Sequence, residues 1–391
     1  MATPRLLFLS PTMPSTSGHG SAMRASVFLE LYSSVFDISL VVVPLFRKRI
    51  FPAEFPRHWC REVRVLDVDQ IPKGASNAGR AATRRQRTYE RVHVFKLVTA
   101  ALGCHYIAGL PGPTQGFTLD LDDYESKKFT RIAALQELEG DAEAAARSRT
   151  AADEFGRLET ELLPCFDRVY VCHDSDRSEL LATHACRDVV TVPNAIRLPR
   201  LVRKARRSCF TLLFVGTMDY FPNEDAVGWF CRYVLPDLRM RSPRPFRLMI
   251  VGARPTAAVQ ALSREDGVTV TGEVRDVGPF YRQADVVIAP VRAGGGTRLK
   301  ILEAMSYRRA VVATTAAAEG LQVRDGREIL LANDPTAFSG RCLMLMADEG
   351  LRRTVSMKGY RWVRRRHTPD AVRRALRSEL ERSTLHKVTG L

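Results

Sequence analysis

The sequence of 391 residues has no long apolar segment, which excludes a protein that spans a membrane with helices. No run approaches the roughly 18 to 20 apolar residues that a helix needs to cross a bilayer. The early run Leu6–Leu9 is too short for the core of a signal peptide, and no small-residue cleavage site follows it. We therefore predict that this run is a buried strand and that the protein is cytoplasmic. Peripheral association with the inner face of the membrane stays open.

Paired cysteines of the kind that bind metals or form disulfide frameworks are also absent. Eight cysteines are scattered along the chain, and none forms a Cys-x-x-Cys pair. No histidine–cysteine cluster has the spacing of a zinc site. The pattern is typical of small buried side chains in a reducing compartment, so we predict no bound metal.

Acidic residues are scarce relative to basic ones, with 43 Asp and Glu against 59 Lys and Arg and a formal net charge of +16. Arginine-rich clusters lie at residues 84–87, 203–207 and 364–366. Three explanations stay open: a nucleic-acid partner, docking on an anionic membrane or acidic acceptor, and a solvated arginine-rich surface. Nucleic acid is the weakest of the three, because no aromatic residues alternate with the clusters and no nucleic-acid-binding motif occurs.

Hydrophobic residues make up 45% of the chain and charged residues 26%, a globular mixture that is long enough for two cores. Apolar runs alternate with helical patterns, which predicts parallel sheets with helices on both faces. The expected strands are 5–10, 37–43, 63–66, 116–121, 168–172, 188–192, 211–215, 247–251, 268–271, 285–289, 310–313 and 328–331. The expected helical segments include 21–34, 89–101, 126–163, 223–234, 297–307 and most of 335–385, and the basic segment 197–208 is the best linker candidate.

The strongest functional signal lies between Ala289 and Met305. A predicted strand leads into the triplet Gly294-Gly295-Gly296, and a predicted helix follows. Glycines let backbone N–H groups approach a ligand closely, and the start of a helix offers unpaired N–H donors with a partial positive charge. The arrangement predicts a phosphate-binding site; the alternative is a plain flexible loop.

Side chains around the start of that helix favour the phosphate site. Thr297 fits an N-cap, in which case its hydroxyl serves the helix rather than a ligand. Arg298 and Lys300 place positive charge in the first turn, where it opposes the helix dipole unless an anion lies nearby. Glu303 lies near the second turn, and a carboxylate there can accept hydrogen bonds from ribose hydroxyls, as in dinucleotide sites.

Together with the stretches around it, this loop resembles the donor site of the retaining GT-B glycosyltransferases of the class called glycosyl transferases group 1. The similar stretches cover nearly all of the second half of the chain, at 214–223, 250–252, 270–274, 311–314 and 318–321. The resemblance implies an α/β fold of two Rossmann-like domains that face each other across a cleft. It also implies transfer of a sugar from a nucleoside diphosphate sugar to an acceptor hydroxyl, with retention of anomeric configuration.

The resemblance also implies a division of labour between domains. An N-terminal domain, residues 1–196, is expected to bind the acceptor, and a C-terminal domain, residues 205–365, the nucleotide sugar. The last segment, 366–391, is expected to pack back on the N-terminal domain as a helix. The acceptor is expected to be a saccharide, a lipid-linked intermediate or a small natural product. Domain closure would then assemble the site and exclude water.

Roles for single residues come from the same resemblance. Glu303 is expected to hold the ribose, and Lys300, with Arg298 as the alternative, to neutralise the leaving diphosphate. A fixed cation stabilises the negative charge that grows as the sugar–diphosphate bond breaks, so no metal or other cofactor is required where it suffices. The other donor-binding candidates are Gly216, Gly272, Glu273, Val274, Gly294, Gly295, Gly296, Thr297 and Leu299.

Two places depart from the family pattern. Many relatives have a glutamate that helps to hold the donor sugar where this chain has Gly295. Relatives often carry an arginine and a lysine after the first glycine turn of the second domain, where this chain has Thr217 and Asn223. Charge stabilisation is therefore expected chiefly from Lys300 and Arg298, and contacts to the sugar from the backbone or elsewhere.

The first half contains a second, weaker candidate for an anion-binding loop. Gly18, His19 and Gly20 lie between a predicted strand and a predicted helix, but turns with two glycines are common. By resemblance, this loop closes against the donor phosphates.

An acidic cluster, Asp120-Leu121-Asp122, follows another predicted strand. The Asp-x-Asp pattern binds a divalent metal in the other major glycosyltransferase fold. Here a metal ligand, an acceptor-side carboxylate and a structural loop all stay open. Asp122 is the candidate catalytic carboxylate, since it could help to deprotonate an acceptor hydroxyl. His105 and His173 are further candidates near strand ends, and each is better explained as structural.

Two rival functions remain. The first is another enzyme with the same fold, such as a sugar epimerase or a phosphorylase. The second is a non-catalytic GT-B-like protein that binds nucleic acid or an anionic membrane surface through the basic clusters. Its support is the net charge of +16 and the glycine at position 295.

Overall fold

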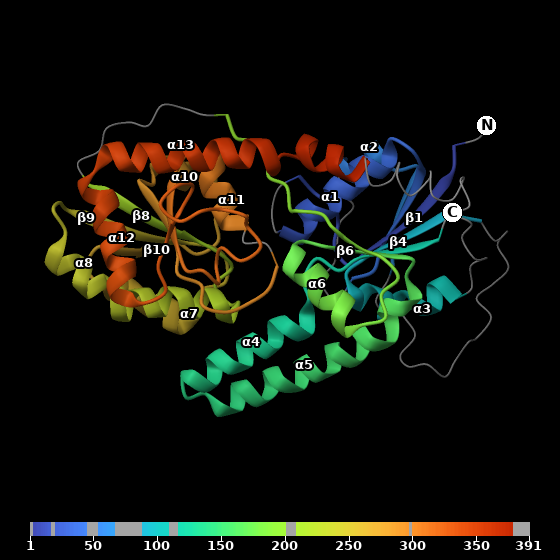
Figure 1. The fold of residues 1–391 in the computed structure, drawn as a ribbon, viewed down its shortest axis with the longest axis horizontal. Coiled ribbons are helices and arrows are strands. Elements are labelled where there is room, and N and C mark those ends of the chain that lie inside the picture. The colour runs from blue at the N-terminus through green and yellow to red at the C-terminus, as the bar shows by residue number, and fades with distance from the viewer. Residues whose placement is uncertain are drawn as a thin grey trace. The chain divides into compact units, whose positions relative to one another are not determined.

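The structure is a computed structural model that describes residues 3–16, 20–44, 54–66, 88–108, 116–200, 209–296 and 299–377. The chain divides into two units, each built on one parallel sheet (Figure 1). The first unit comprises Met1–Lys127, Thr150–Ala195 and Val372–Leu391, and the second comprises Lys128–Arg149 and Ile196–Ala371. None of the helices in the described ranges combines the length and the apolar character needed to cross a membrane.

The sheet of the first unit has seven parallel strands in the order β3-β2-β1-β4-β5-β6-β7. Its central strands are almost fully buried, as parallel strands covered on both faces must be, and Leu6 to Leu9 in β1 have no exposed surface. The strands are β1 (Arg5–Ser10), β2 (Asp37–Val42), β3 (Glu62–Val65), β4 (Arg91–Phe95), β5 (Phe117–Asp120), β6 (Arg168–Val171) and β7 (Val189–Thr191). The helices that begin in this unit are α1 (Gly20–Ser33), α2 (Glu54–Trp59), α3 (Leu97–Ala108), α4 (Glu125–Leu138) and α6 (Asp174–Thr183).

The sheet of the second unit has six parallel strands in the order β10-β9-β8-β11-β12-β13. The strands are β8 (Phe210–Val215), β9 (Phe246–Val251), β10 (Val268–Val270), β11 (Val286–Ala289), β12 (Ala310–Ala313) and β13 (Leu330–Leu331). The helices are α7 (Phe221–Trp229), α8 (Leu235–Arg241), α9 (Ala257–Ala261), α10 (Gly278–Gln283), α11 (Leu299–Ser306), α12 (Pro335–Ala347) and α13 (Glu349–Arg366). A π-helical turn, Phe230–Val234, joins α7 to α8.

Both sheets have the same kind of strand order, and this order indicates the edge of each sheet at which a ligand would bind. In each sheet the strand order reverses next to the first strand, between β1 and β4 in one and between β8 and β11 in the other. In open α/β sheets, ligands bind outside the carboxyl ends of the strands at such a reversal. The segments that follow β1, β4, β8 and β11 are therefore the first places to look for a site.

The prediction of a helix over residues 89–101 is wrong at its centre, because Arg91–Phe95 form the central strand β4 and helix α3 starts only at Leu97. His93, in the middle of β4, is completely buried among the rings of Phe8, Phe28 and Tyr32. Burial lowers the pKa of His93 well below its usual range, so this ring is neutral in the core. Val92, His93 and Val94 alternate apolar and polar side chains with the period of two that is typical of a strand. The polar side chains interrupt the apolar run that would otherwise have predicted a buried strand.

The long helical segment predicted for residues 126–163 is two helices, α4 and α5 (Ala142–Leu162), which run side by side in Figure 1. Gly140, at φ +81°, turns the chain between them, and Asp141 accepts a hydrogen bond from the N–H of Ala144 at 2.9 Å. The end of this pair, Lys128–Arg149, groups with the second unit, although it falls within the range 1–196 expected for the first domain. A bidentate ion pair between Arg131 and Glu319 holds it there.

Helix continues over residues 369–377 after α13, and its apolar side chains belong to the first unit. Val372 and Leu376 are buried in the cluster that contains Phe28 of α1. Arg373 also donates to the Glu30 carboxylate at 2.5 Å. The chain therefore returns to the first unit after completing the second.

Candidate donor site

The candidate donor site lies at the carboxyl edge of the second unit's sheet, where the strand order reverses. Gly216 follows β8, Gly252 follows β9, Gly272 follows β10, and the triplet Gly294–Gly296 follows β11. Backbone contacts join three of these turns: the N–H of Gly252 donates to the carbonyl of Gly272 at 3.2 Å, and the N–H of Gly216 donates to that of Val251 at 3.0 Å. The ends of the strands thus form one continuous rim.

Two of these turns have no room for a side chain. A Cβ on Gly252 would lie 1.7 Å from the carbonyl oxygen of Gly216, and a Cβ on Gly216 would lie 2.8 Å from Nδ2 of Asn223. Real Cβ atoms essentially never come within 3.0 Å of such neighbours. Glycine at both positions lets the first turn of α7 and the ends of β8 and β9 approach one another.

Lys300 lies in the first turn of α11 and points its ammonium group at this rim. Its Nζ donates to Oδ1 of Asn223 at 2.6 Å, and Nδ2 of Asn223 donates to the carbonyl of Thr217 at 2.8 Å. The same ammonium lies 4.0 Å from the centre of the Phe214 ring. A neutral amide and an aromatic face thus hold a cation at the positive end of a helix, where an anion would be favoured.

Glu303 lies one turn further along α11, and Tyr281 of α10 fixes its carboxylate. The hydroxyl of Tyr281 donates to Oε2 of Glu303 at 2.7 Å, and the Tyr281 ring stacks on Tyr307 with centroids 5.1 Å apart. Burial raises the pKa of Glu303, and the Tyr281 hydrogen bond and the Lys300 charge oppose that rise. Within the described residues, no hydrogen bond to Oε1 is seen, so this oxygen remains as an acceptor for a ligand.

The glycine loop after β11 adopts backbone conformations that favour glycine at two of its three positions. Gly294 and Gly296 have φ of +119° and +66°. Gly295 lies against α4, since a Cβ there would lie 3.0 Å from Cβ of Lys128. The aliphatic stem of Lys128 therefore fills the space in which a side chain at position 295 would lie. Thr297 and Arg298, two of the predicted site residues, lie outside the described residues.

Beyond the loop, three further donor candidates, Gly272, Glu273 and Val274, follow the sheet's outer strand β10. Gly272 has φ of +71° and no atom within 4 Å of an added Cβ, so this turn is open. Glu273 is exposed and Val274 is half-buried. The structure thus brings Gly216, Gly272, Lys300 and Glu303 to one edge, and it adds Asn223 as a partner of Lys300 and Tyr281 as a partner of Glu303.

The first unit has its own polar cluster at the corresponding edge. Oδ2 of Asp122 accepts from the hydroxyl of Ser21 at 2.9 Å and pairs with Nζ of Lys96 at 3.1 Å. Lys96 follows β4 and Asp122 follows β5, and both have φ in the left-handed region, at +68° and +59°. Strained non-glycine residues of this kind persist where the surrounding structure holds them, often at functional sites. The sequence did not predict Lys96 as a site residue, because the helix predicted over residues 89–101 covers the end of β4.

A buried ion pair between Arg24 and Asp120 lies next to this cluster, since Asp120 also accepts a hydrogen bond from the N–H of Asp122. The guanidinium of Arg24 donates to both oxygens of Asp120 at 2.8 Å, and also to the carbonyl of Val192 at 2.7 Å. Both side chains are almost completely buried, so Asp120 is committed to Arg24. Within the described ranges, no group of three or more histidine, cysteine or acidic side chains is arranged to hold a metal ion.

The other candidates of the first half are placed as follows. Gly20 is the first residue of α1, whereas Gly18 and His19 lie outside the described residues. His173 is buried, and its Nδ1 lies 3.3 Å from Oδ2 of Asp176, in the first turn of α6. This contact orders the start of a helix. The side chain of His105 lies outside the part of the chain whose side chains are described.

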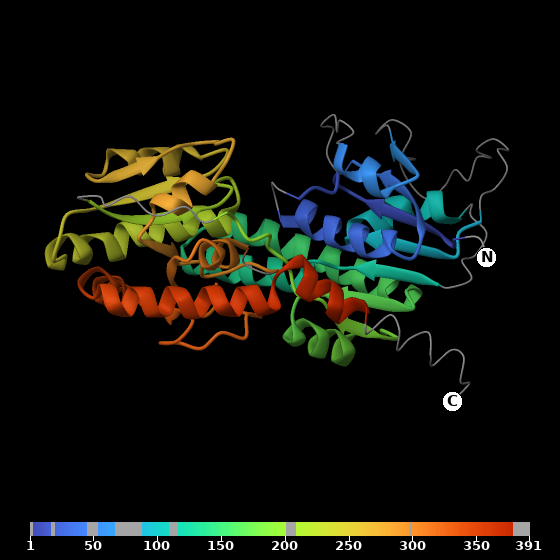
Figure 2. The same ribbon diagram turned by 90° about the horizontal axis from the view of Figure 1, so that it is seen from above.

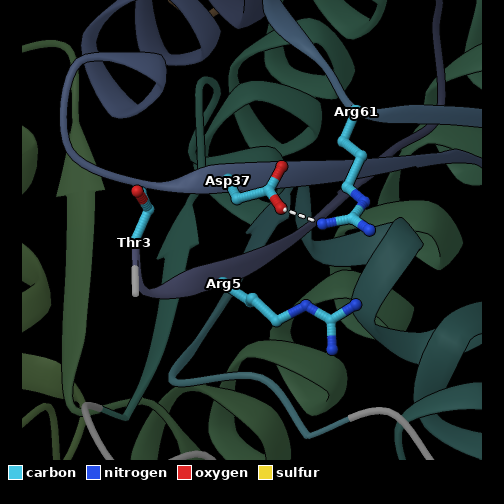
Figure 3. Close-up of a pocket in the computed structure, with 4 residues that line it drawn as sticks. All are labelled: Thr3, Arg5, Asp37 and Arg61. Carbon is cyan, nitrogen blue, oxygen red and sulfur yellow. Dashed lines mark hydrogen bonds and ion pairs between the residues drawn. The ribbon is translucent and has the colours of Figure 1, made fainter. Parts of the chain in front are cut away.

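A depression of about 680 Å³ in the first unit is separate from these sites (Figure 3). Thr3, Arg5, Asp37 and Arg61 line it, and Arg61 donates to Asp37 at 2.9 Å. Strands β1 and β2 begin at Arg5 and Asp37, so the depression lies at the amino ends of the strands. Ligands of open α/β sheets bind at the opposite edge.

Comparison with known proteins shows what the second half of the chain is similar to. Residues 209–348 match the model of the family described as "Glycosyl transferases group 1". A protein of Klebsiella pneumoniae, described as "Uncharacterized 44.6 kDa protein in cps region", is 26% identical over 136 residues. That match spans 33% of this chain and 35% of the relative, so it covers about a third of each.

Solved structures resemble the chain over almost its whole length. Sucrose-phosphate synthase from Thermosynechococcus elongatus superposes with a TM-score of 0.69 at 15% identity, over 98% of this chain and 100% of that one. Alr3699/HepE of Anabaena, solved in complex with UDP and glucose, gives a TM-score of 0.64 at 13% identity, over 97% and 99%. A glycosyltransferase from Rickettsia africae gives 0.62 at 10% identity, over 98% and 99%.

At these identities, the likeness to whole structures shows the fold alone. The expected α/β class, with two domains that are each built on a parallel sheet, is confirmed. Residues 209–348 are similar to the family described as glycosyl transferases group 1, and the chain as a whole has the two-domain α/β fold seen in the GT-B glycosyltransferases.

Proposed function

We propose that the protein is a glycosyltransferase that moves a sugar from a nucleoside diphosphate sugar to an acceptor hydroxyl, with retention of anomeric configuration. The observation that carries the proposal is that Tyr281 holds Glu303 and Asn223 holds Lys300 on the same helix, with the Gly216 turn beside Asn223. It gathers a carboxylate, a cation and a tight glycine turn at the sheet edge where α/β folds bind nucleotides. Similar structures have been solved with UDP and with UDP-glucose, which supports a nucleotide-sugar donor.

In this proposal Lys300 stabilises the leaving diphosphate. Negative charge grows on the diphosphate as its bond to the sugar breaks, and a fixed cation stabilises that charge more than it stabilises the intact donor. Asn223 holds the ammonium in place before the donor arrives, so little reorganisation is needed. The N–H groups at the start of α11 add to the same stabilisation. Arg298 remains the alternative cation.

Glu303 binds the ribose in this proposal. Tyr281 occupies one carboxylate oxygen and leaves Oε1 to accept hydrogen bonds from ribose hydroxyls. A carboxylate that is held before binding loses less conformational entropy when it meets its ligand. The base then lies toward Gly272, Glu273 and Val274, and the glycine loop Gly294–Gly296 presents backbone amides to the phosphates or the sugar.

The first unit supplies the acceptor side. Asp122 is the carboxylate proposed to help deprotonate the acceptor hydroxyl, and Ser21 and Lys96 orient it. The cation and helix N-terminus of the second unit do the work that a divalent metal does in other transferases, so the proposal needs no metal. The acceptor is a hydroxyl-bearing saccharide, a lipid-linked intermediate or a small natural product.

A thermal-shift screen against UDP, GDP, ADP and dTDP, without added metal, tests donor binding. A ligand at about 100 times its dissociation constant adds about 2.7 kcal/mol to the stability of the state that it binds. We expect one nucleotide to stabilise the wild type and the Glu265→Ala control, which removes an exposed carboxylate of the same unit. Glu303→Ala should lose that stabilisation.

Activity tests the chemistry separately. Lys300→Ala and Glu303→Ala should each cut sugar transfer sharply while the melting temperature without ligand stays near that of the wild type. If both variants keep wild-type rates, the site assignment is wrong. If no nucleotide stabilises the protein and binding to a polyanion falls steeply with salt, the non-catalytic rival is correct instead.

A further inference from the structure

Helix α13 (Glu349–Arg366) has one buried face and one exposed face, and the exposed face is basic. It lies along the side of the second unit as a long helix (Figure 2). The buried face consists of Val355, Ser356, Gly359, Trp362 and Val363. Five exposed cations form what we call the basic stripe: Arg353, Lys358, Arg361, Arg364 and Arg365. With 3.6 residues per turn and 1.5 Å per residue, they occupy an arc of about 140° over about 18 Å.

The basic stripe differs from several other exposed arginines of the protein. Some exposed arginines elsewhere pair with carboxylates, for example Arg147 with Glu143 and Arg187 with Asp167. Within the described residues, no ion pair is found for any member of the basic stripe. The only acidic residue of α13 is Glu349, in its first turn. The basic stripe is thus a surface on which every charge is positive.

Like charges three and four residues apart on a helix repel each other and destabilise it, as Arg361 does with Arg364 and Arg365. An anionic surface outside the protein would relieve this repulsion. Arg308 adds a sixth cation beside the stripe, since its guanidinium lies 4.6 Å from the Tyr360 ring on the same helix. The charges of the stripe follow one exposed face of a single helix.

We propose that the basic stripe docks the protein on the surface of an anionic lipid bilayer. A straight row of cations on a convex helix can meet a plane of headgroups along its whole length, and each Lys or Arg near such a surface strengthens binding. Single-stranded nucleic acid would need a basic groove with aromatic platforms for its bases. The aromatic residues of α13 do not offer them, because Tyr360 is half-buried under Arg308 and Trp362 is buried against His367.

The test measures binding of the full chain to vesicles by sedimentation, without any sugar donor, so its outcome is independent of the proposed transferase activity. Vesicles of phosphatidylcholine mixed with phosphatidylglycerol are compared with vesicles of phosphatidylcholine alone. The stripe variant combines Arg361→Gln, Arg364→Gln and Arg365→Gln. The control combines Arg64→Gln, Arg147→Gln and Arg187→Gln, three exposed arginines that pair with carboxylates.

We expect the wild type to bind only the mixed vesicles, and the stripe variant to bind them about 100-fold more weakly. The control loses the same charge at positions outside α13, and it should change binding less than about threefold because it leaves the basic stripe intact. A third variant with lysine at the same three stripe positions keeps the charge and should bind like the wild type. Melting temperatures verify that all variants are folded.

Three outcomes would overturn the proposal. Equal weakening in the stripe and control variants would mean that net charge, not this surface, drives binding. Equal binding to neutral vesicles would exclude headgroup charge as the partner. If mixed vesicles do not bind the wild type but a single-stranded oligonucleotide does, and the stripe variant loses that binding, the partner is nucleic acid.

Discussion

A buried carboxylate in the first unit makes the stability of the protein depend on pH. Glu159 lies on α5 with no exposed surface, and its Oε1 accepts a hydrogen bond from the N–H of Ser126 at 3.1 Å. That bond caps the first turn of α4. Within the described part of the chain, Oε2 has no hydrogen-bond partner. Burial raises the pKa of Glu159 from 4.5 to about 7, against the opposing effect of Ser126.

The sign of the effect follows from which state holds the proton. Between pH 4.5 and 7, native Glu159 keeps a proton that the unfolded chain has released, so rising pH lowers the free energy of unfolding. The difference in pKa corresponds to about 3 kcal/mol, lost progressively as pH rises to 7 and constant above it. Glu159→Gln keeps an oxygen that can accept from Ser126 and carries no charge at any pH. The variant should therefore not lose this stability.

Urea unfolding of the wild type and Glu159→Gln from pH 4.5 to 8 measures this effect. The free energy of unfolding of the variant, relative to the wild type, should rise by about 3 kcal/mol over that range. Glu161→Gln removes an exposed carboxylate from the same helix and gives the baseline. A relative stability of Glu159→Gln that does not change between pH 4.5 and 8 would refute the reasoning, because it would mean that the carboxyl is not desolvated.

Other predictions follow from single contacts. Gly252→Ala should destabilise the second unit by about 3 kcal/mol or more in urea unfolding, because its Cβ would overlap a carbonyl oxygen. Gly228 lies near the end of α7, and no atom lies within 4 Å of an added Cβ. Gly228→Ala should therefore stabilise the second unit by about 0.5 to 1 kcal/mol. Tyr281→Phe should weaken nucleotide binding about tenfold in calorimetry, since it frees the Glu303 carboxylate. Lys96→Met should reduce sugar transfer about tenfold or more and leave nucleotide affinity unchanged, and an equal loss of nucleotide affinity would remove Lys96 from the acceptor side.

The sequence predicts most of this fold because parallel strands buried on both faces are continuous apolar runs. Strand β1 and the central strands β8, β11 and β12 of the second sheet have that pattern, and each was placed within one or two residues of its observed bounds. Strand β4 does not, since a charged residue and a histidine alternate with its valines. Its identity as a strand depends on Phe8, Phe28 and Tyr32, whose rings enclose His93 and are distant in sequence. The short alternation of Val92, His93 and Val94 also indicates a strand, but only these distant rings explain why a histidine is buried within it.

The same distinction separates the site residues that the sequence predicts from those that it does not. Lys300 places a positive charge in the first turn of a helix, where it opposes the helix dipole, and Glu303 follows in the second turn after a glycine loop. Their neighbours in sequence therefore already suggest an anion and a hydroxyl ligand. Tyr281 and Lys96 have no such local signal, because each meets its partner only when segments separated in sequence come together in the fold. Residues that contact a ligand can therefore leave a trace in the local sequence, whereas residues that orient them become visible only in the fold. Variants of this second kind are the stronger test of the structure, since the sequence alone gives no reason to expect an effect.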